Sequence, residues 1–195
     1  MFYLASRSPR RKQLLEQLGV AFELLHVDVP EIRRADESAE DYVSRVACEK
    51  ALAGFAVVRD RDERTLVLGA DTEVVLNDRV FGKPRGADDA AAMLRELSGR
   101  THRVISTVWC VDSVRRESAT SVSDVRFTGL TGAGIEAYVA TGEPFGKAGA
   151  YAIQGRAAAF IEHLSGSYSG VMGLPLHETA RLLRQFGIQG KPGLS

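Results

Sequence analysis

The chain contains little cysteine, no long hydrophobic run and no net charge. Its two cysteines, Cys48 and Cys110, show no metal-binding or redox spacing and are expected to act as small apolar side chains. No stretch approaches the roughly 18 apolar residues of a membrane-spanning helix, and the first residues show no hydrophobic signal segment. Basic and acidic residues both number 25, so no overall positive field attracts nucleic acid. We therefore expect a cytoplasmic protein with no membrane partner and no nucleic-acid partner.

Several common catalytic motifs are missing as well. Neither GxGxxG nor GxxxxGK[ST] occurs, so Rossmann and Walker nucleotide sites are not predicted. The four histidines are scattered, without an HExxH pattern or a serine elbow. The remaining composition, 45% hydrophobic and 26% charged, is typical of a globular protein with a real core. The length favours a single domain over residues 1–195, ending in a loose tail over 190–195.

The apolar pattern alternates between strand-like and helix-like segments. Helices are predicted over 9–18, 38–57, 89–97, 131–142 and 175–186. Strands are predicted over 2–5, 20–29, 65–70, 101–114, 117–127 and 157–163, with a hairpin around 73–81 and a flexible connector over 165–170. This order predicts an α/β fold with a mixed sheet.

The junction between the first strand and the first helix carries a phosphate-binding signature. Ser8 is a natural N-cap and Pro9 suits the first helical position. Free N–H groups at the helix N-terminus favour an anion, and Ser6, Arg10 and Arg11 add a hydroxyl and two cations. The alternative is a capped helix with a solvated basic first turn. It leaves unexplained why cations stand at the positive end of the helix dipole.

Asp71 is the best candidate for chemistry, because it follows the apolar strand predicted over 65–70. A carboxylate at a strand end is held rigidly and is partly desolvated, which suits metal ligation or proton abstraction. An isolated aspartate in that place also forms ordinary turns. Lys50 stands on the apolar face of a predicted helix, where it is either functional or snorkels to water. Taken singly, the other candidates are compatible with an ordinary surface or loop: Glu31, Lys83 and Gln154.

Taken together, these residues fit phosphoryl transfer. That chemistry uses carboxylates to hold a divalent metal, most simply Mg²⁺ or Mn²⁺, and cations to neutralise the transferred group. Glu31 and Asp71 are the candidate metal ligands. The candidate cations are Arg10, Arg11, Lys50 and Lys83.

The ordered set of motifs is specific, although each motif alone is weak. The motifs are Ser6-Arg7-Ser8-Pro9-Arg10-Arg11, Glu49-Lys50-Ala51, Gly69-Ala70-Asp71-Thr72, Gly82-Lys83-Pro84-Arg85, Gly149-Ala150-Tyr151-Ala152-Ile153-Gln154-Gly155, and Gly166-Ser167-Tyr168 followed by Gly173-Leu174-Pro175-Leu176. In this order they resemble the Maf family of nucleoside triphosphate pyrophosphatases over nearly the whole chain.

The resemblance implies an inosine-triphosphatase-like (Maf/Ham1) architecture, with an elongated mixed β-sheet flanked by helices and two lobes around a cleft. It also implies a cytoplasmic enzyme that is often a homodimer and requires a divalent metal. Such an enzyme hydrolyses a nucleoside triphosphate to the monophosphate and pyrophosphate.

Carried over by position, Asp71 matches the family's proton acceptor. The specificity positions are Arg10, Thr72 and Gln154, and the other active-site positions are Ser6, Glu31, Lys50 and Lys83. The Ala-Tyr-x-Ile-Gln form of the late motif resembles the branch that acts on dTTP and UTP, with modified pyrimidine nucleotides as further candidates. A glutamate near the position of Gln154 marks a branch that favours 7-methyl-GTP.

Two positions depart from the family pattern: Arg7 replaces a small residue, and Gly170 stands where asparagine is common. A second function also stays open, a nucleotide-binding regulator of cell division and septum formation with little turnover. Asp71 beside Lys50 and Lys83 favours the enzyme.

Overall fold

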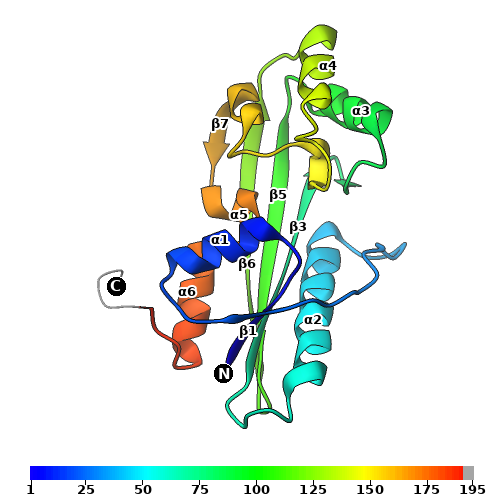
Figure 1. Cartoon of the computed structure of the whole chain (residues 1–195). Coiled ribbons are helices and arrows are strands. Elements are labelled where there is room, and N and C mark those ends of the chain that lie inside the picture. The colour runs from blue at the N-terminus through cyan, green and yellow to red at the C-terminus, as the bar shows by residue number, and fades with distance from the viewer. Residues whose placement is uncertain (191–195) are drawn as a thin grey trace.

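The structure is a computed structural model in which residues 1–190 are described, and its shape is elongated (Figure 1). Three long strands run through most of its length: β3 (Leu66–Leu76), β5 (Thr101–Val111) and β6 (Arg116–Phe127). They belong to a seven-stranded sheet of order β2-β1-β3-β5-β6-β7, in which β4 also pairs with β3. The β1–β2 and β1–β3 pairs are parallel and the other pairs are antiparallel. The mixed sheet predicted from the sequence is confirmed.

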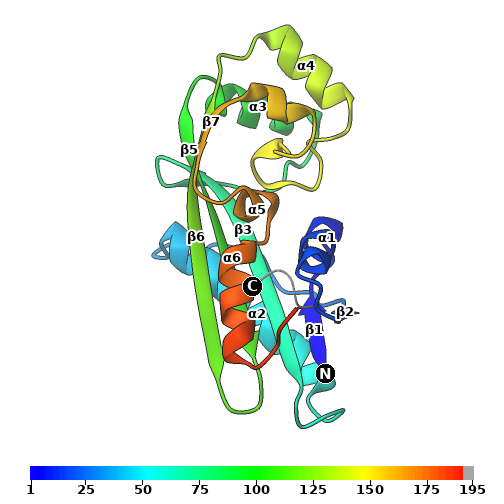
Figure 2. The same ribbon diagram turned by 90° about the vertical axis from the view of Figure 1, so that its left-hand side faces the viewer.

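The helices cover both faces of this sheet. Figure 1 shows α2 (Ala39–Val58) and α6 (Leu176–Gln185) on opposite sides of the long strands, and α1 (Pro9–Gln17) lies on the α6 side (Figure 2). Two further helices, α3 (Ala87–Leu97) and α4 (Gly132–Ala140), pack at the far end of the sheet. The end of the sheet with α1, α2 and α6 forms one lobe, and the end with α3 and α4 forms the other. No helix in the described part of the chain is both long enough and apolar enough to cross a bilayer.

The alternation of side chains along β3 distributes them between the two faces. Leu66, Leu68 and Ala70 pack with α1 and α6, whereas Val67 packs on the α2 side. By the same alternation, Asp71 and Glu73 point to the α2 face. The strand therefore delivers two carboxylates to one side of the sheet.

The edge of β3 that faces away from β5 is interrupted. β1 (Phe2–Ala5) pairs with residues 66–69 of this edge, and β4 (Arg79–Phe81) pairs with residues 74–76. Residues 70–73 therefore have no strand partner there, although β5 pairs with β3 from Val67 to Val75 along the other edge. The prediction that Asp71 follows the end of a strand was wrong. The pairing with β5 continues through the polar triplet Asp71-Thr72-Glu73 and keeps Asp71 in the middle of β3.

Other boundaries also differ from the predictions. The strand expected over 20–29 is only β2 (Glu23–Leu25), because no residue beyond Leu25 pairs with β1. The strand expected over 157–163 begins at Ile161 as β7 (Ile161–Ser165), and a 3₁₀ turn, η2 (Arg156–Phe160), precedes it. The connector expected over 165–170 contains the start of α5 (Tyr168–Met172). From residue 191 on, the expected tail lies outside the described residues.

Local signals in the sequence correctly mark several other boundaries. The hydroxyls of Ser8, Ser38 and Thr131 cap α1, α2 and α4. Asn77 and Asp78 adopt φ values of 50° and 62°, as a tight two-residue hairpin turn requires. These features depend on neighbouring residues alone, so the sequence predicts them well.

Gly69 allows α2 to lie directly on β3. A Cβ atom at this position would stand 2.3 Å from the Ala47 carbonyl oxygen and 2.5 Å from the Ala51 nitrogen. Both neighbours are helix backbone and have no rotamer by which to move aside. The close approach brings Lys50, on the same turn of α2, over the adjacent part of β3.

We therefore expect Gly69→Ala to destabilise the fold by roughly 1–3 kcal/mol, because it overpacks the contact between helix and sheet. Urea unfolding measures this change. Gly132→Ala is the matched control, since no atom lies within 4 Å of the added Cβ. Equal stability of the two variants would contradict the role assigned to Gly69.

Candidate functional site

A cleft of about 500 Å³ opens where β3 lacks its edge partner. This volume is typical of sites for small molecules. All the residues that the sequence predicts for the site line the cleft: Ser6, Arg10, Arg11, Glu31, Lys50, Asp71, Thr72, Lys83 and Gln154. They come from six separate segments, which only the folded sheet brings together.

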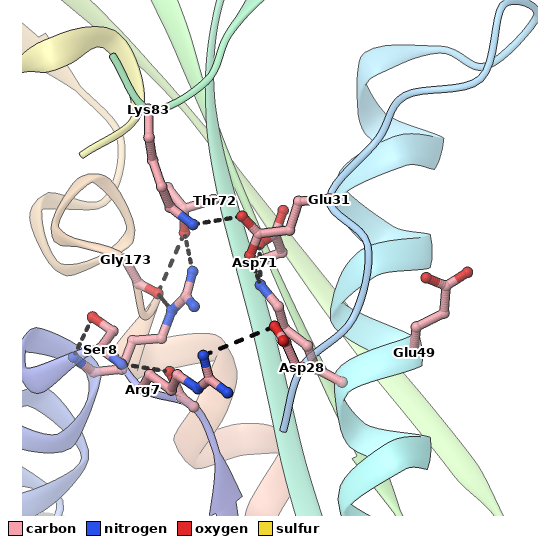
Figure 3. Close-up of polar contacts among 12 residues, drawn as sticks. Arg7, Ser8, Asp28, Glu31, Glu49, Asp71, Thr72, Lys83 and Gly173 are labelled. Carbon is pink, nitrogen blue, oxygen red and sulfur yellow. Dashed lines mark hydrogen bonds and ion pairs between the residues drawn. The ribbon is translucent and has the colours of Figure 1, made fainter. Parts of the chain in front are cut away.

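Lys50 links two carboxylates at the α2 side of the cleft. Its Nζ atom lies 2.7 Å from Asp71 Oδ1 and 2.6 Å from Glu31 Oε1. Lys83 pairs with the other Glu31 oxygen, and Glu31, Asp71 and Lys83 converge in the close-up (Figure 3). Asp71 Oδ2 is buried and has no hydrogen-bond partner in the described part of the chain. Asp71 therefore keeps one acceptor oxygen available.

The two lysines hold Glu31 in its charged form. Partial burial alone raises the pKa of Glu31, but hydrogen bonds and charges from Lys50 and then Lys83 outweigh burial and lower it to about 2. Lys50 and Asp71 are both buried, so each charge depends on its partner. The snorkelling alternative for Lys50 is wrong in this structure.

Arg11 extends from the first turn of α1 into the cleft. Its Nε donates to the Gly173 carbonyl at 2.8 Å and its Nη2 donates to Thr72 Oγ1 at 3.3 Å. Thr72 in turn contacts Ser106 Oγ at 2.7 Å, and Ser106 donates to the Gly170 carbonyl at 2.6 Å. Burial lowers the pKa of Arg11, while the charges of nearby carboxylates, Asp71 first, oppose that shift. The guanidinium is thus fixed by neutral partners and keeps its charge available.

The N-terminus of α1 forms the adjoining wall. Ser8 Oγ accepts from the Arg11 backbone N–H at 3.4 Å, and Ser6 Oγ accepts from the Ser8 N–H at 3.1 Å. No described carboxylate lies within ion-pairing distance of Arg10. Burial, and then the charge of Arg11, lowers the pKa of Arg10. The crowding of these cations would be relieved by a bound anion.

Gln154 lies on a loop from the other lobe and is exposed along the cleft. The loop is anchored by Glu143, whose carboxylate accepts from the Arg156 N–H at 3.0 Å and from the Tyr138 hydroxyl at 2.8 Å. Lys147 also lines the cleft and donates to the Glu143 carbonyl. The loop that carries Gln154 is therefore held in place by these hydrogen bonds, which suits Gln154 to selective contacts with a ligand.

Sequence reasoning missed three residues around the cleft. Glu73 lines it on the same face of β3 as Asp71, Lys147 adds a cation, and Ser106 completes the network that holds Thr72. The two-residue spacing of Asp71 and Glu73 would have revealed Glu73 once β3 was assigned as continuous. Nothing local marks Ser106, which reaches the site through its register opposite Thr72.

The structure shows the surroundings of Arg7 and Gly170, the two departures from the family pattern. Arg7 lies at the rim of the cleft, is largely exposed and pairs loosely with Asp28 at 3.9 Å. Gly170 packs closely, because a Cβ atom there would lie 3.1 Å from the Ser167 Cβ and 3.3 Å from the Ser121 hydroxyl. A larger side chain at position 170 would require these two serines to shift.

The carboxylates of the cleft fit a divalent cation in part. Within residues 1–190, no group of three or more His, Cys, Asp or Glu side chains is arranged to hold a metal. Magnesium often binds through one or two carboxylates together with substrate phosphates and water, so a full protein cage is not required. The unpartnered Asp71 Oδ2 fits that role. Both Glu31 oxygens are already engaged by lysines, which disfavours Glu31 as a ligand in this conformation.

Fold and cleft together define an α/β protein whose site combines a basic helix N-terminus, a buried lysine–aspartate pair and a polar loop from a second lobe. This arrangement is suited to a phosphorylated ligand. The profile of the Maf-like protein family matches residues 1–186, and the chain belongs to this family. The resemblance drawn from the motifs is confirmed.

Relatives of this chain align with it over nearly their whole length. A protein of Xanthomonas axonopodis pv. citri named dTTP/UTP pyrophosphatase is 63% identical over 188 residues, covering 96% of this chain and 99% of the relative. One of Chromobacterium violaceum with the same name is 53% identical, covering 96% and 95%. Among solved structures, the Ham1 protein of Staphylococcus aureus aligns with a TM-score of 0.44 at 12% identity, covering 95% of this chain and 96% of that one.

The buried Lys50–Asp71 pair leads to a prediction about stability. Lys50→Met leaves Asp71 buried without its cation, which should lower the free energy of unfolding by roughly 3 kcal/mol. Adding Asp71→Asn removes the uncompensated charge, so the double variant should recover much of this loss. Urea unfolding of the two single variants and the double variant gives the coupling.

Lys12→Met is the matched control, because Lys12 forms only an exposed ion pair with Glu16. A Lys50→Met protein as stable as this control would show that the pair contributes nothing to folding.

Proposed function

We propose that this protein hydrolyses nucleoside triphosphates to the monophosphate and pyrophosphate, with dTTP and UTP as preferred substrates. The observation that carries the proposal is the cleft, where buried Asp71, paired with Lys50, shares one site with Arg10 and Arg11, which form no ion pair among residues 1–190. The names of relatives that are more than half identical support the same activity and the same substrates.

The cations of the cleft account for binding of the triphosphate. Arg10, Arg11 and the N-terminus of α1 offer positive charge and N–H donors, and neither arginine forms an ion pair within the described residues. Lys50 and Lys83 reach a phosphate only in competition with Glu31, which already pairs with both. We infer that the pyrophosphate leaving group is neutralised between these two sets of cations.

Asp71 is suited to accept a proton from the attacking water. Its Oδ1 is held by Lys50, which fixes the carboxylate, while its buried Oδ2 accepts no hydrogen bond from residues 1–190. Water oriented by Oδ2 would attack the α-phosphorus. A divalent cation, Mg²⁺ or Mn²⁺, when bound, would polarise the phosphate oxygens and offset their charge. Asp71 is one residue of this chain that would hold this cation.

Gln154, with Thr72 and Arg10, is proposed to set specificity. A primary amide offers a donor and an acceptor side by side, which matches the N3–H and O4 groups of uracil and thymine. Thr72 acts through Arg11, since its hydroxyl is engaged in the network with Ser106. The family resemblance further supports a cytoplasmic homodimer as the working form.

The direct test is a panel of nucleoside triphosphates with Mg²⁺, in which release of pyrophosphate is measured. We expect turnover of dTTP and UTP well above that of ATP and GTP. Asp71→Asn should lower kcat by about 10²–10⁴-fold, the usual contribution of a general base, without unfolding the protein. Asp124→Asn, an exposed aspartate on β6, is the control.

No pyrophosphate from any nucleotide would overturn the proposal and favour the nucleotide-binding regulator. Near-normal kcat in Asp71→Asn would remove Asp71 from the chemical step while leaving the activity in place.

Base selection is tested separately with Gln154→Glu. A carboxylate has no donor for O4, so we expect turnover of dTTP and UTP to fall by at least about tenfold, the loss of roughly one hydrogen bond. Steady-state kinetics with each nucleotide measures this effect. The control is Gln185→Glu at the end of α6. If Gln154→Glu behaves like the control, the base is recognised elsewhere.

A further inference from the structure

Glu73 is a buried carboxylate without a partner. It is 7% exposed, lines the cleft, and its Oε2 atom has no hydrogen-bond partner among residues 1–190. No described lysine or arginine lies within ion-pairing distance of it. Burying a carboxylate in this way is costly, so an unpaired one calls for a ligand that the chain alone does not supply.

Side-chain packing does not explain why position 73 carries a glutamate. Glu73 stands opposite Ile105 on β5, and the next residue on the same face of β3, Val75, packs against Ile105 and Tyr42. A valine or isoleucine at position 73 would extend this apolar cluster. Glu73 is also buried on the same face of β3 as Asp71, a second carboxylate, and no described cation pairs with it. The environment is therefore unfavourable for the carboxylate unless a cation arrives.

Asp71 and Glu73 are placed to share such a cation. Two residues apart on one strand, they point to the same face, with Cα atoms about 7 Å apart. Each has one buried carboxylate oxygen with no hydrogen-bond partner in the described part of the chain, and both residues line the cleft. Magnesium–oxygen distances of about 2 Å allow two side chains at this spacing to converge on one ion, with phosphate oxygens and water completing the shell.

We propose that Glu73, together with Asp71, ligates the divalent cation of the cleft, in place of the Glu31–Asp71 pair expected from the sequence. Glu31 instead holds Lys50 and Lys83, as both its oxygens already do. The proposal rests on the proposed function, because the nucleotide's phosphates supply the remaining ligands.

The test measures metal binding directly. Mn²⁺ is titrated into the full-length protein, alone and with a non-hydrolysable α,β-methylene analogue of dTTP, and the free ion is followed by electron paramagnetic resonance. Glu73→Gln keeps the side-chain shape and is neutral, so folding should be retained. We expect it to weaken Mn²⁺ binding by at least about tenfold, and to abolish the rise in Tm that Mn²⁺ gives the unaltered protein.

Glu117→Gln, an exposed glutamate on β6, is the matched control and should bind Mn²⁺ normally. Asp71→Asn should also lose binding. If Glu73→Gln does not fold, Glu73→Val, which extends the apolar cluster, takes its place and should lose Mn²⁺ equally. Unchanged affinity in the folded Glu73 variant, or no Mn²⁺ binding by the unaltered protein under either condition, overturns the proposal.

Pyrophosphate release separates this proposal from the activity. If the unaltered protein turns over dTTP with Mn²⁺ but the Glu73 variant binds the ion normally, the ligand assignment fails and the function stands. If the Glu73 variant loses Mn²⁺ but the unaltered protein releases no pyrophosphate, the metal site stands and the function fails.

Discussion

The interrupted edge of β3 is the constraint on which the site depends. β5 pairs with β3 along one edge from Val67 to Val75, while β1 and β4 divide the other edge and leave residues 70–73 uncovered. A strand that ended at this point would lose the ladder that fixes its side chains. A fully paired strand would have a neighbour where the ligand must lie. Continuous pairing on one side and a gap on the other give Asp71 a rigid backbone and an open approach.

Charge compensation in the cleft follows from that geometry. Gly69 lets α2 approach β3 closely, and this approach brings Lys50 to Asp71. Because both groups are buried, Asp71 without Lys50 would be an uncompensated charge, whereas Lys50 without Asp71 keeps its contact with Glu31. Glu31 then pairs with Lys50 and Lys83 from a loop, so these two lysines are balanced by Glu31 and Asp71 without a ligand, whereas Glu73 on the same face is not paired with any described cation. The loop carrying Glu31 therefore competes with any phosphate for the same two lysines.

Much of this was accessible from the sequence, and what was missed has a common cause. The caps at Ser8 and Ser38 and the turn at Asn77 depend on local hydrogen bonds and backbone conformation, which neighbouring residues determine. The motif residues were also found, since their order along the chain is specific. The continuation of β3 through Asp71 was not, because a polar triplet resembles a strand end until β5 is seen beside it. The environments of Arg11 and Glu73 depend on partners remote in sequence, Gly173 and Ile105, and no local pattern encodes them.

The two walls of the cleft differ in what an arriving anion must displace. On the α1 side, Arg10 and Arg11 have no acid partner within residues 1–190, and an incoming phosphate meets their charge without breaking an ion pair. On the α2 side, a phosphate can contact Lys50 or Lys83 only if Glu31 releases that lysine. A triphosphate would therefore gain its first favourable contacts at α1. The same ligand reaches Lys50 and Lys83 only by displacing Glu31, so the order in which the cations are engaged follows from which of them are already paired.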